Sequence, residues 1–261
     1  MKKSKLILGA ATVGLFAAAA PSGFAQALGY SLPPNAQEIE PGVYYIGRVK
    51  DHAGRNIDGI AFLHPRKANA KPGGDAGPVK QTQCYTFLAS GARWKTIEDF
   101  VVAQNIAKVP AYLAAIDSSL ANWEVAAGTQ IFGNRTTDAV DFGSIGNAAN
   151  DKNEVTFGPI AQPGVIAVTF VWGIFGGPPQ GRQLTEWDMI LDDGDFIWSS
   201  TGEAGKMDFW NIFAHESGHA AGLGHPSNSC TDETMYAYAD LGETKKQTLN
   251  AGDVAGISAL Y

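Results

Sequence analysis

The chain has 261 residues, of which 45% are hydrophobic and 17% charged, and its formal net charge is −7. This composition is typical of a folded protein with a proper core, and the length suits one or two domains. An acidic chain repels phosphates, and no basic stripe interrupts its acidic part, so we expect no nucleic-acid partner.

The first residues form a pattern typical of an export signal. Lys2, Lys3 and Lys5 precede an apolar run over 6–20, and Ala25-Gln26-Ala27 matches the small-x-small pattern of signal-peptidase cleavage. The run is short for a membrane span, which disfavours a retained anchor. We predict a signal peptide over 1–27 and an exported protein, extracellular, at the cell surface or periplasmic, without stable membrane insertion.

Residues 28–80 look like a small separate unit. Residues 43–49 and 57–64 read as two strands around a turn at 51–55, which predicts a β-hairpin. Residues 66–80 are rich in Lys, Gly, Pro and Ala and predict a flexible linker open to proteolysis.

The charge of the exported chain is unevenly divided. Residues 28–80 carry seven Lys or Arg against five Asp or Glu, whereas residues 81–261 carry nine against twenty-one. A basic unit before an acidic domain suits an inhibitory pro-segment that lies over a cleft. An accessory hairpin that stays attached is the alternative.

Residues 81–261 alternate strand and helix patterns, which predicts a mixed α/β (α+β) domain. An apolar face, formed by Tyr112, Leu113, Ile116, Leu120 and Trp123, indicates a long helix over 111–126. Short apolar runs indicate strands at 100–102, 131–132, 155–157, 165–171 and 188–191, and helices are expected at 208–222 and near the end of the chain.

The most informative segment is the sequence HExxHxxGxxH, which runs from His215 to His225. On a helix, His215 and His219 are separated by about 40° and about 6 Å, so both imidazoles face one ion. Gly222 can adopt positive φ, which allows the helix to stop and His225 to return as third ligand. Three neutral imidazoles leave a fourth zinc position open, as in catalytic rather than structural sites, with Glu216 beside it.

This segment resembles the active-site motif of the metzincin clan of zinc endopeptidases, which is followed by a Met-turn. Met235 lies ten residues after His225, and Met235-Tyr236-Ala237-Tyr238 is similar to the matrixin pattern, with Ala237 where proline is usual. The resemblance implies a metzincin-like catalytic domain over 81–261, with a twisted mixed sheet, a backing helix, an active-site helix and a C-terminal helix. It also implies that Tyr236 and Tyr238 wall the S1′ pocket.

The last thirteen residues resemble the closing helix of matrixin catalytic domains. Asp253 matches a family aspartate that braces the Met-turn. Gly252 stands where a second family aspartate receives the new amino terminus after activation, so that ion pair is not expected here.

The two cysteines, Cys84 and Cys230, fit an oxidising compartment. A disulfide would tie the S1′ loop to the start of the catalytic domain. The alternative is a cysteine switch, in which Cys84 fills the fourth zinc position, although the matrixin switch context is missing around it.

The resemblance also bears on further metals. Animal matrixins hold a second, structural zinc, but no His remains after Gln81 outside the motif, so we predict one zinc ion per chain. The run ending in Asp192, Asp193 and Asp195 resembles the family strand that ends in calcium-binding carboxylates. A solvated acidic turn is the equal alternative, and calcium stays open.

These observations predict a secreted zinc endopeptidase, acting as a monomer on protein or peptide substrates. Glu216 would take a proton from the attacking water and pass it to the leaving amine. A peptide would add as a strand along the expected edge strand at 165–171. A catalytically silent zinc-binding or surface interaction protein is the second hypothesis, and a hydrolase of non-peptide amides the third.

Overall fold

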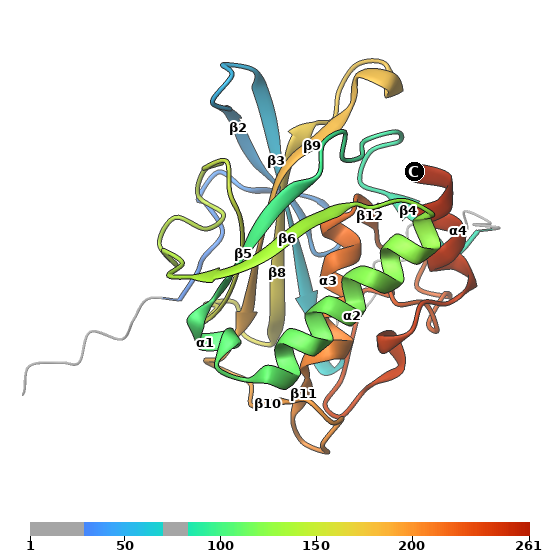
Figure 1. The fold of residues 1–261 in the computed structure, drawn as a ribbon. Coiled ribbons are helices and arrows are strands. Elements are labelled where there is room, and N and C mark those ends of the chain that lie inside the picture. Colours follow the sequence, from blue (N-terminus) through green and yellow to red (C-terminus); the bar gives the residue numbers. More distant parts are fainter. Residues whose placement is uncertain (1–28, 70–82) are drawn as a thin grey trace, which may run out of the picture.

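The computed structural model describes residues 29–69 and 83–261 (Figure 1). The predicted signal peptide and most of the predicted linker lie outside the described residues. Among the residues that are described, no helix is long and apolar enough to cross a membrane.

An eight-stranded mixed sheet forms the centre of the molecule, which confirms the predicted α/β class. Across the sheet the strands are β1 (Gln37–Glu40), β2 (Val43–Lys50), β3 (Asn56–Pro65), β8 (Val165–Ile174), β9 (Gln183–Asp192), β7 (Asn153–Gly158), β5 (Glu98–Ala103) and β6 (Phe132–Asp138). The half from β9 to β6 is parallel, whereas β8 and the first three strands pair antiparallel.

Helices cover one face of this sheet. They are α1 (Gln104–Ala107), α2 (Pro110–Ala127), α3 (Phe209–Ala220) and α4 (Ala251–Leu260). In Figure 1, α2 lies across α3, and α4 lies at the side. Helix α2 begins at a proline and ends at Gly128, which adopts φ 68°, both being favourable at those ends.

The predicted apolar face of α2 is confirmed at four of its five positions. Tyr112, Ile116, Leu120 and Trp123 are buried, and Leu113 is partly buried. The Trp123 indole donates a hydrogen bond of 2.9 Å to the Ala214 carbonyl of α3. The long helix therefore fixes the position of the helix that carries the motif.

Short elements complete the fold. They are the 3-10 turns η1 (Lys67–Asn69), η2 (Pro179–Gly181) and η3 (Lys245–Gln247), and the strand pairs β10 (Trp198–Ser199) with β11 (Met207–Asp208) and β4 (Thr86–Phe87) with β12 (Leu223–Gly224).

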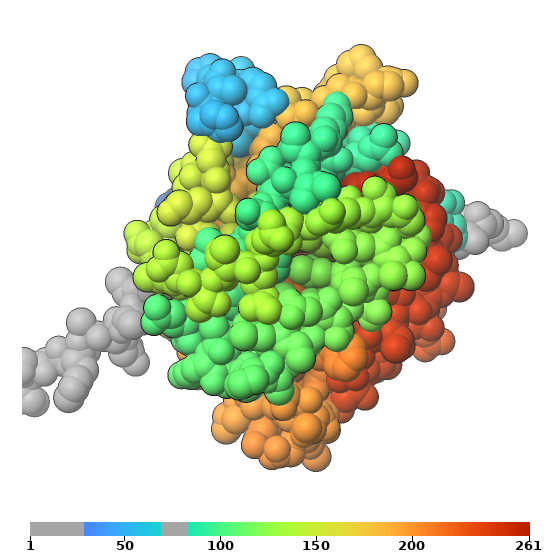
Figure 2. Space-filling model, viewed as in Figure 1, coloured from blue at the N-terminus to red at the C-terminus, as the bar shows by residue number. Residues whose placement is uncertain are grey.

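The amino-terminal hairpin, β2 and β3, forms as predicted, and its tip stands out from the upper edge of the molecule (Figure 2). The hairpin joins the central sheet, because β3 pairs with β8 from Asp58↔Gly173 to Pro65↔Val165. The expectation that 165–171 forms an edge strand is therefore wrong for the chain with its hairpin in place.

The physical reason lies in β3 itself. Its residues from Gly59 to His64 are all buried, on both faces of the sheet. A strand that is apolar on both faces needs a neighbour at each edge and a layer on each side, as an interior strand has.

Candidate active site

Helix α3 carries the first half of the motif. Asp208 caps it by accepting a hydrogen bond of 2.8 Å from the backbone N–H of Asn211, which satisfies one free donor of the first turn. The predicted helix at 208–222 is thus confirmed. His215 and His219 are both fully buried and project from one face of it.

The helix ends where the motif requires it. Gly222 adopts φ 103°, as expected from its place after the second histidine. Residues 223–224 then pair with β4, and His225 returns to the helix. The Nε2 atom of His219 lies 3.1 Å from that of His215 and 3.0 Å from that of His225.

The three imidazoles fit a zinc ion. The Nδ1 atoms of His215 and His219 face the carbonyls of Thr234 and Leu223, at 2.7 and 2.9 Å, so each must carry its proton on Nδ1. This leaves the Nε2 lone pairs directed at one another, which is unfavourable without a cation. A tetrahedral zinc with Zn–N bonds of about 2.0–2.1 Å places such nitrogens about 3.3–3.4 Å apart, close to what is seen.

Burial also favours the neutral form of these rings. It lowers the pKa of His215 and His225 well below the usual value, and that of His219 to about 3. Neutral imidazoles are the form that binds zinc.

Glu216 is fully buried beside the triad, and both of its oxygens are engaged. Oε2 accepts a hydrogen bond of 2.6 Å from the hydroxyl of Thr169 on β8, and Oε1 lies 2.8 Å from Nδ1 of His64 on β3. Burial raises the pKa of Glu216 to about 8, while the Thr169 bond opposes that shift. A carboxylate with a raised pKa beside a metal can exchange protons near neutral pH.

His64 is a site residue that the sequence did not reveal. Its ring lies 3.9 Å from the ring of His215, centroid to centroid, and 1% of its surface is exposed. Two residues earlier, Phe62 stacks on His219 at 4.0 Å. One signal was present: a polar residue at the end of a strand that is otherwise buried needs a partner inside the protein.

Lys246 is the second residue that the sequence did not reveal. It is fully buried, and its Nζ donates to the carbonyl of Tyr236 and lies 3.3 Å from Nε2 of His64. It also lies 3.2 Å from Nδ1 of His215. Burial lowers the pKa of Lys246 to about 7.

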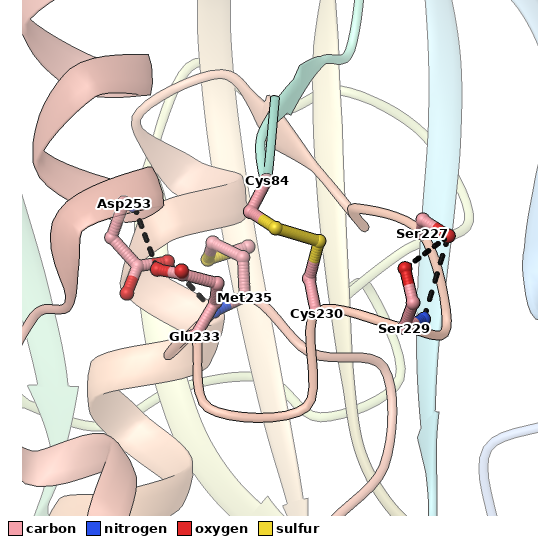
Figure 3. The surroundings of a disulfide bond; sticks show 7 residues. All are labelled: Cys84, Ser227, Ser229, Cys230, Glu233, Met235 and Asp253. Atoms are coloured by element: carbon pink, nitrogen blue, oxygen red, sulfur yellow. Dashed lines mark hydrogen bonds between the residues drawn. A yellow bond between two sulfur atoms is a disulfide. The ribbon is translucent and has the colours of Figure 1, made fainter. Parts of the chain in front are cut away.

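Met235, the residue expected in a Met-turn, lies beside Asp253 (Figure 3). Asp253 accepts hydrogen bonds from the backbone N–H groups of Thr234 and Met235, at 2.7 and 3.0 Å, which is the bracing role that the resemblance implied. Gly218 of α3 lies directly against this turn, because a Cβ there would be 2.2 Å from the Met235 sulfur.

The disulfide between Cys84 and Cys230 is confirmed, with the two Cα atoms 5.6 Å apart (Figure 3). It joins Cys84, two residues before β4, to the loop between His225 and Met235. Gly252 packs against Cys84, where a Cβ would lie 2.3 Å from the Cys84 carbonyl oxygen. Since Cys84 is bonded, it is not free to act as the metal ligand of a cysteine switch.

The expected S1′ wall lies beside the triad. Tyr236 is buried, Tyr238 is partly buried, and their rings pack edge to face at 5.5 Å. A surface cavity of about 210 Å³ lies between the wall and the hairpin, lined in part by His225, Tyr238 and Leu63. The triad therefore has an opening to solvent while β3 is in place.

The three acidic residues considered for calcium behave differently from one another. Asp192 is buried and accepts hydrogen bonds from the N–H groups of Ile160, Gly194 and Asp195, whereas Asp193 and Asp195 are exposed. Within 29–69 and 83–261, groups of three acidic, His or Cys ligand atoms occur only at the triad and at His64, His215 and Glu216. The calcium site stays a prediction without support from this geometry.

Comparison with known proteins points the same way as the motif. Residues 135–261 match the family model described as Matrixin. The crystal structure of metalloproteinase-II from Bacteroides fragilis is similar at 13% identity over 84% of this chain and 77% of that chain, but its TM-score of 0.36 is too low to carry an argument. No curated protein matches the chain.

Proposed function

We propose that the chain is a matrixin-like metzincin, as the family match over residues 135–261 supports, and that it is an exported zinc endopeptidase in which Glu216 transfers the proton of the attacking water. The single observation that carries this is the approach of the His219 Nε2 atom to 3.1 Å from that of His215 and 3.0 Å from that of His225, beside a buried carboxylate.

The proposed mechanism assigns a role to each side chain. His215, His219 and His225 would hold the zinc ion, which when bound would supply Lewis-acid activation of water and of the peptide carbonyl. Glu216 takes the proton of the attacking water and gives it to the departing amine. Thr169 orients the carboxylate through its hydrogen bond to Oε2, which leaves Oε1 to face the water.

Oε1 can serve the water only if His64 leaves, which makes latency part of the proposal. We propose residues 1–27 as the signal peptide, 28–80 as a pro-segment and 81–261 as the catalytic domain. In the latent chain β3 lies along β8, Phe62 covers His219, and His64 engages Glu216. Each contact blocks a position that a substrate or water needs.

The course of the chain after β3 supports the same reading. The N–H of Arg66 donates to the carbonyl of Gly164 on one side, and the N–H of Lys67 donates to the carbonyl of Ala239, the residue after Tyr238, on the other, both at 2.8 Å. Arg66 also pairs with Asp240 at 2.7 Å. The segment thus runs between the β8 side and the wall, the path proposed for a bound peptide once β3 has left.

The second candidate is a catalytically silent zinc-binding protein on the same scaffold. The observation that favours it is that both oxygens of Glu216 are engaged and the groove beside it is filled by the chain itself. It differs from the first candidate in predicting no turnover after the hairpin has been released.

Three forms of the exported chain separate these candidates: untreated, cut between β3 and β4 by limited proteolysis, and cut in the presence of a zinc chelator. Each is assayed on a diverse library of quenched peptides. We expect the cut form to cleave peptides, the untreated form to cleave far more slowly, and the chelator to abolish cleavage.

Glu216→Gln is the decisive variant. We expect it to keep zinc while turnover falls by about 10²- to 10⁴-fold, the usual contribution of an acid–base group. Glu186→Gln is the matched control, because Glu186 is also buried but its carboxylate accepts hydrogen bonds from the backbone N–H groups of Asn150 and Asp151 and not from residues of the triad. If the unsubstituted protein holds zinc but cleaves no peptide after the cut between β3 and β4, the catalytically silent zinc-binding protein is the better candidate.

A further inference from the structure

Lys246 lies in the first turn beyond the S1′ loop, and its position is unusual for a lysine. It is fully buried, one residue after the exposed Lys245. Its ammonium contacts the first zinc ligand, the carbonyl of the wall residue Tyr236 and the ring of His64. Buried amines normally occur only where acceptors satisfy their N–H groups.

Two of these neighbours belong to the catalytic domain, but His64 does not. Since the Nδ1–H of His64 faces the Glu216 carboxylate, its Nε2 is left as an acceptor toward Lys246. The His64 imidazole therefore fills the space between α3, Tyr236 and Lys246. It belongs to the hairpin and not to residues 81–261, and its Nε2 is a hydrogen-bond acceptor for Nζ of Lys246.

Release of β3 empties this space. Lys246 then keeps the Tyr236 carbonyl, while the donor that faced His64 has no partner in the pocket except solvent. An amine donates whether it is charged or neutral, so the pocket presents a donor in either state. A side chain that brings an acceptor to this point restores what His64 supplied.

We propose that Lys246 determines specificity, by selecting substrates whose side chain in this pocket, just after the cleaved bond, carries a hydrogen-bond acceptor. The class comprises Glu, Gln and His, with the carboxylate favoured because charge-assisted hydrogen bonds are stronger. Leu, Met and Phe are disfavoured, because they leave a buried donor without a partner. This inference rests on the proposed function.

The first test compares peptides that differ only in the residue after the cleaved bond. For the cut form of the exported chain, we expect kcat/KM for Gln and Glu to exceed that for Met by about tenfold or more. Lys246→Met should remove or reverse this ratio, largely through KM. Lys245→Met, which changes the same charge one residue away on the exposed side, should leave the ratio intact. A preference for Met in the unsubstituted enzyme would overturn the proposal.

The second test needs no catalysis and uses the uncut chain. His64 is the ligand, and thermal unfolding is followed for His64→Leu, Lys246→Met, the double variant and the parent, each with zinc content measured. We expect His64→Leu to lower the melting temperature less in the Lys246→Met background than in the parent, because the bond to Glu216 is lost in both and only the parent also loses the acceptor for Lys246. Additive losses would show that Lys246 does not recognise the acceptor in the pocket.

The two tests fail in different ways. If no cut form cleaves any peptide, the endopeptidase proposal fails. The melting temperatures of the parent, the two single variants at His64 and Lys246 and the double variant still decide whether the pocket selects an acceptor. If cleavage occurs but the cycle is additive and the peptide ratio is flat, only the specificity proposal fails.

Discussion

In the proposed zinc triad, His215 and His219 are each held by a carbonyl that faces the Nδ1 atom of the ring. His225 depends on the turn at Gly222, not on the helix, and it is the most exposed of the three rings. Without His225, the proposed zinc site would keep only the two ligands on α3 and would lack one of the three protein ligands of a tetrahedral catalytic site.

His225→Ala should therefore lower zinc affinity by orders of magnitude while α3 stays folded. Zinc content after dialysis against a weak chelator, measured beside far-UV circular dichroism, checks this. The unsubstituted chain should retain one zinc ion. Unchanged occupancy in the variant would remove His225 from the ligand set, and two ions per parent chain would contradict the single-zinc prediction.

A second residue-scale prediction concerns Asp188 on β9. Its carboxyl is fully buried, and Oδ2 has no hydrogen-bond partner among the described residues. Burial, and then the charges of Glu186 and Glu154, raise the pKa of Asp188 well above 3.8. The folded state thus binds this proton more tightly than the unfolded state does.

A carboxyl group whose pKa is raised in the folded state stabilises the fold fully at pH values below its pKa in the unfolded state. This stabilisation is lost as the pH rises through the pKa in the folded state. We expect Asp188→Asn to raise the melting temperature relative to the parent at pH 8 and to differ little at pH 4. Thermal unfolding of both proteins across this range checks the sign, and the histidines titrate alike in both. A melting temperature of Asp188→Asn that exceeded that of the parent at pH 4 but not at pH 8 would contradict this prediction.

At the scale of elements, the contact between α3 and the Met-turn leaves no room for a methyl group. A Cβ at Gly218 would lie 2.2 Å from the Met235 sulfur and 2.8 Å from Cζ2 of Trp123. Gly218→Ala should destabilise by about 1–3 kcal/mol through overpacking, even though alanine favours helices.

Chemical denaturation measures this effect. Gly176→Ala, where no atom lies within 4 Å of the added Cβ, is the control and should change stability by less than about 0.5 kcal/mol. Equal effects of the two substitutions would show that the Met-turn can move aside.

The pairing of β3 with β8 can be tested by a covalent lock. Leu63 and Val168 lie opposite each other, and the N–H of Leu63 points away from β8, toward Gly42. Side chains of such non-hydrogen-bonded pairs approach most closely. The double variant Leu63→Cys and Val168→Cys should stay inactive after the cut between β3 and β4, and a reductant should release activity.

The parent treated with the same reductant controls for loss of the native disulfide, and Leu63→Cys alone controls for packing. Full activity of the oxidised double variant after the cut would show that β3 does not occupy the groove that substrate needs.

These elements differ in how far the sequence could predict them. Helix α3, the turn at Gly222 and the β2–β3 hairpin depend on contacts within 19 residues along the chain, so local patterns predict them. The pairing of β3 with β8 joins residues 100 to 115 positions apart, and its register depends on packing at both faces. His64 and Lys246 reach the site only through that pairing and through η3, so no local pattern could place them there.

At the scale of the whole molecule, the disulfide closes the longest covalent loop. Cys84 and Cys230 are 146 residues apart. In the chain-entropy account a loop of this length contributes about 5 kcal/mol. We expect the double variant Cys84→Ser and Cys230→Ser to unfold at a clearly lower denaturant concentration, with intact zinc sites in the protein that remains folded.

Denaturant titration of oxidised parent, reduced parent and variant measures this. The reduced parent should behave like the variant, since both lack the same link. An unchanged midpoint in both would mean that the native contacts around Gly252 already fix this end of the chain.

The seat of β3 also has a consequence for solubility. A released hairpin leaves the β8 ladder with bare N–H and C=O groups above an apolar surface, and such an edge pairs readily with any extended chain, including another copy of itself. The activated protein should therefore self-associate as its concentration rises, whereas the uncut chain stays dispersed. The proposed pro-segment would then have a second role as an intramolecular chaperone. It would keep the edge of β8 covered during export, until a substrate pairs with that edge.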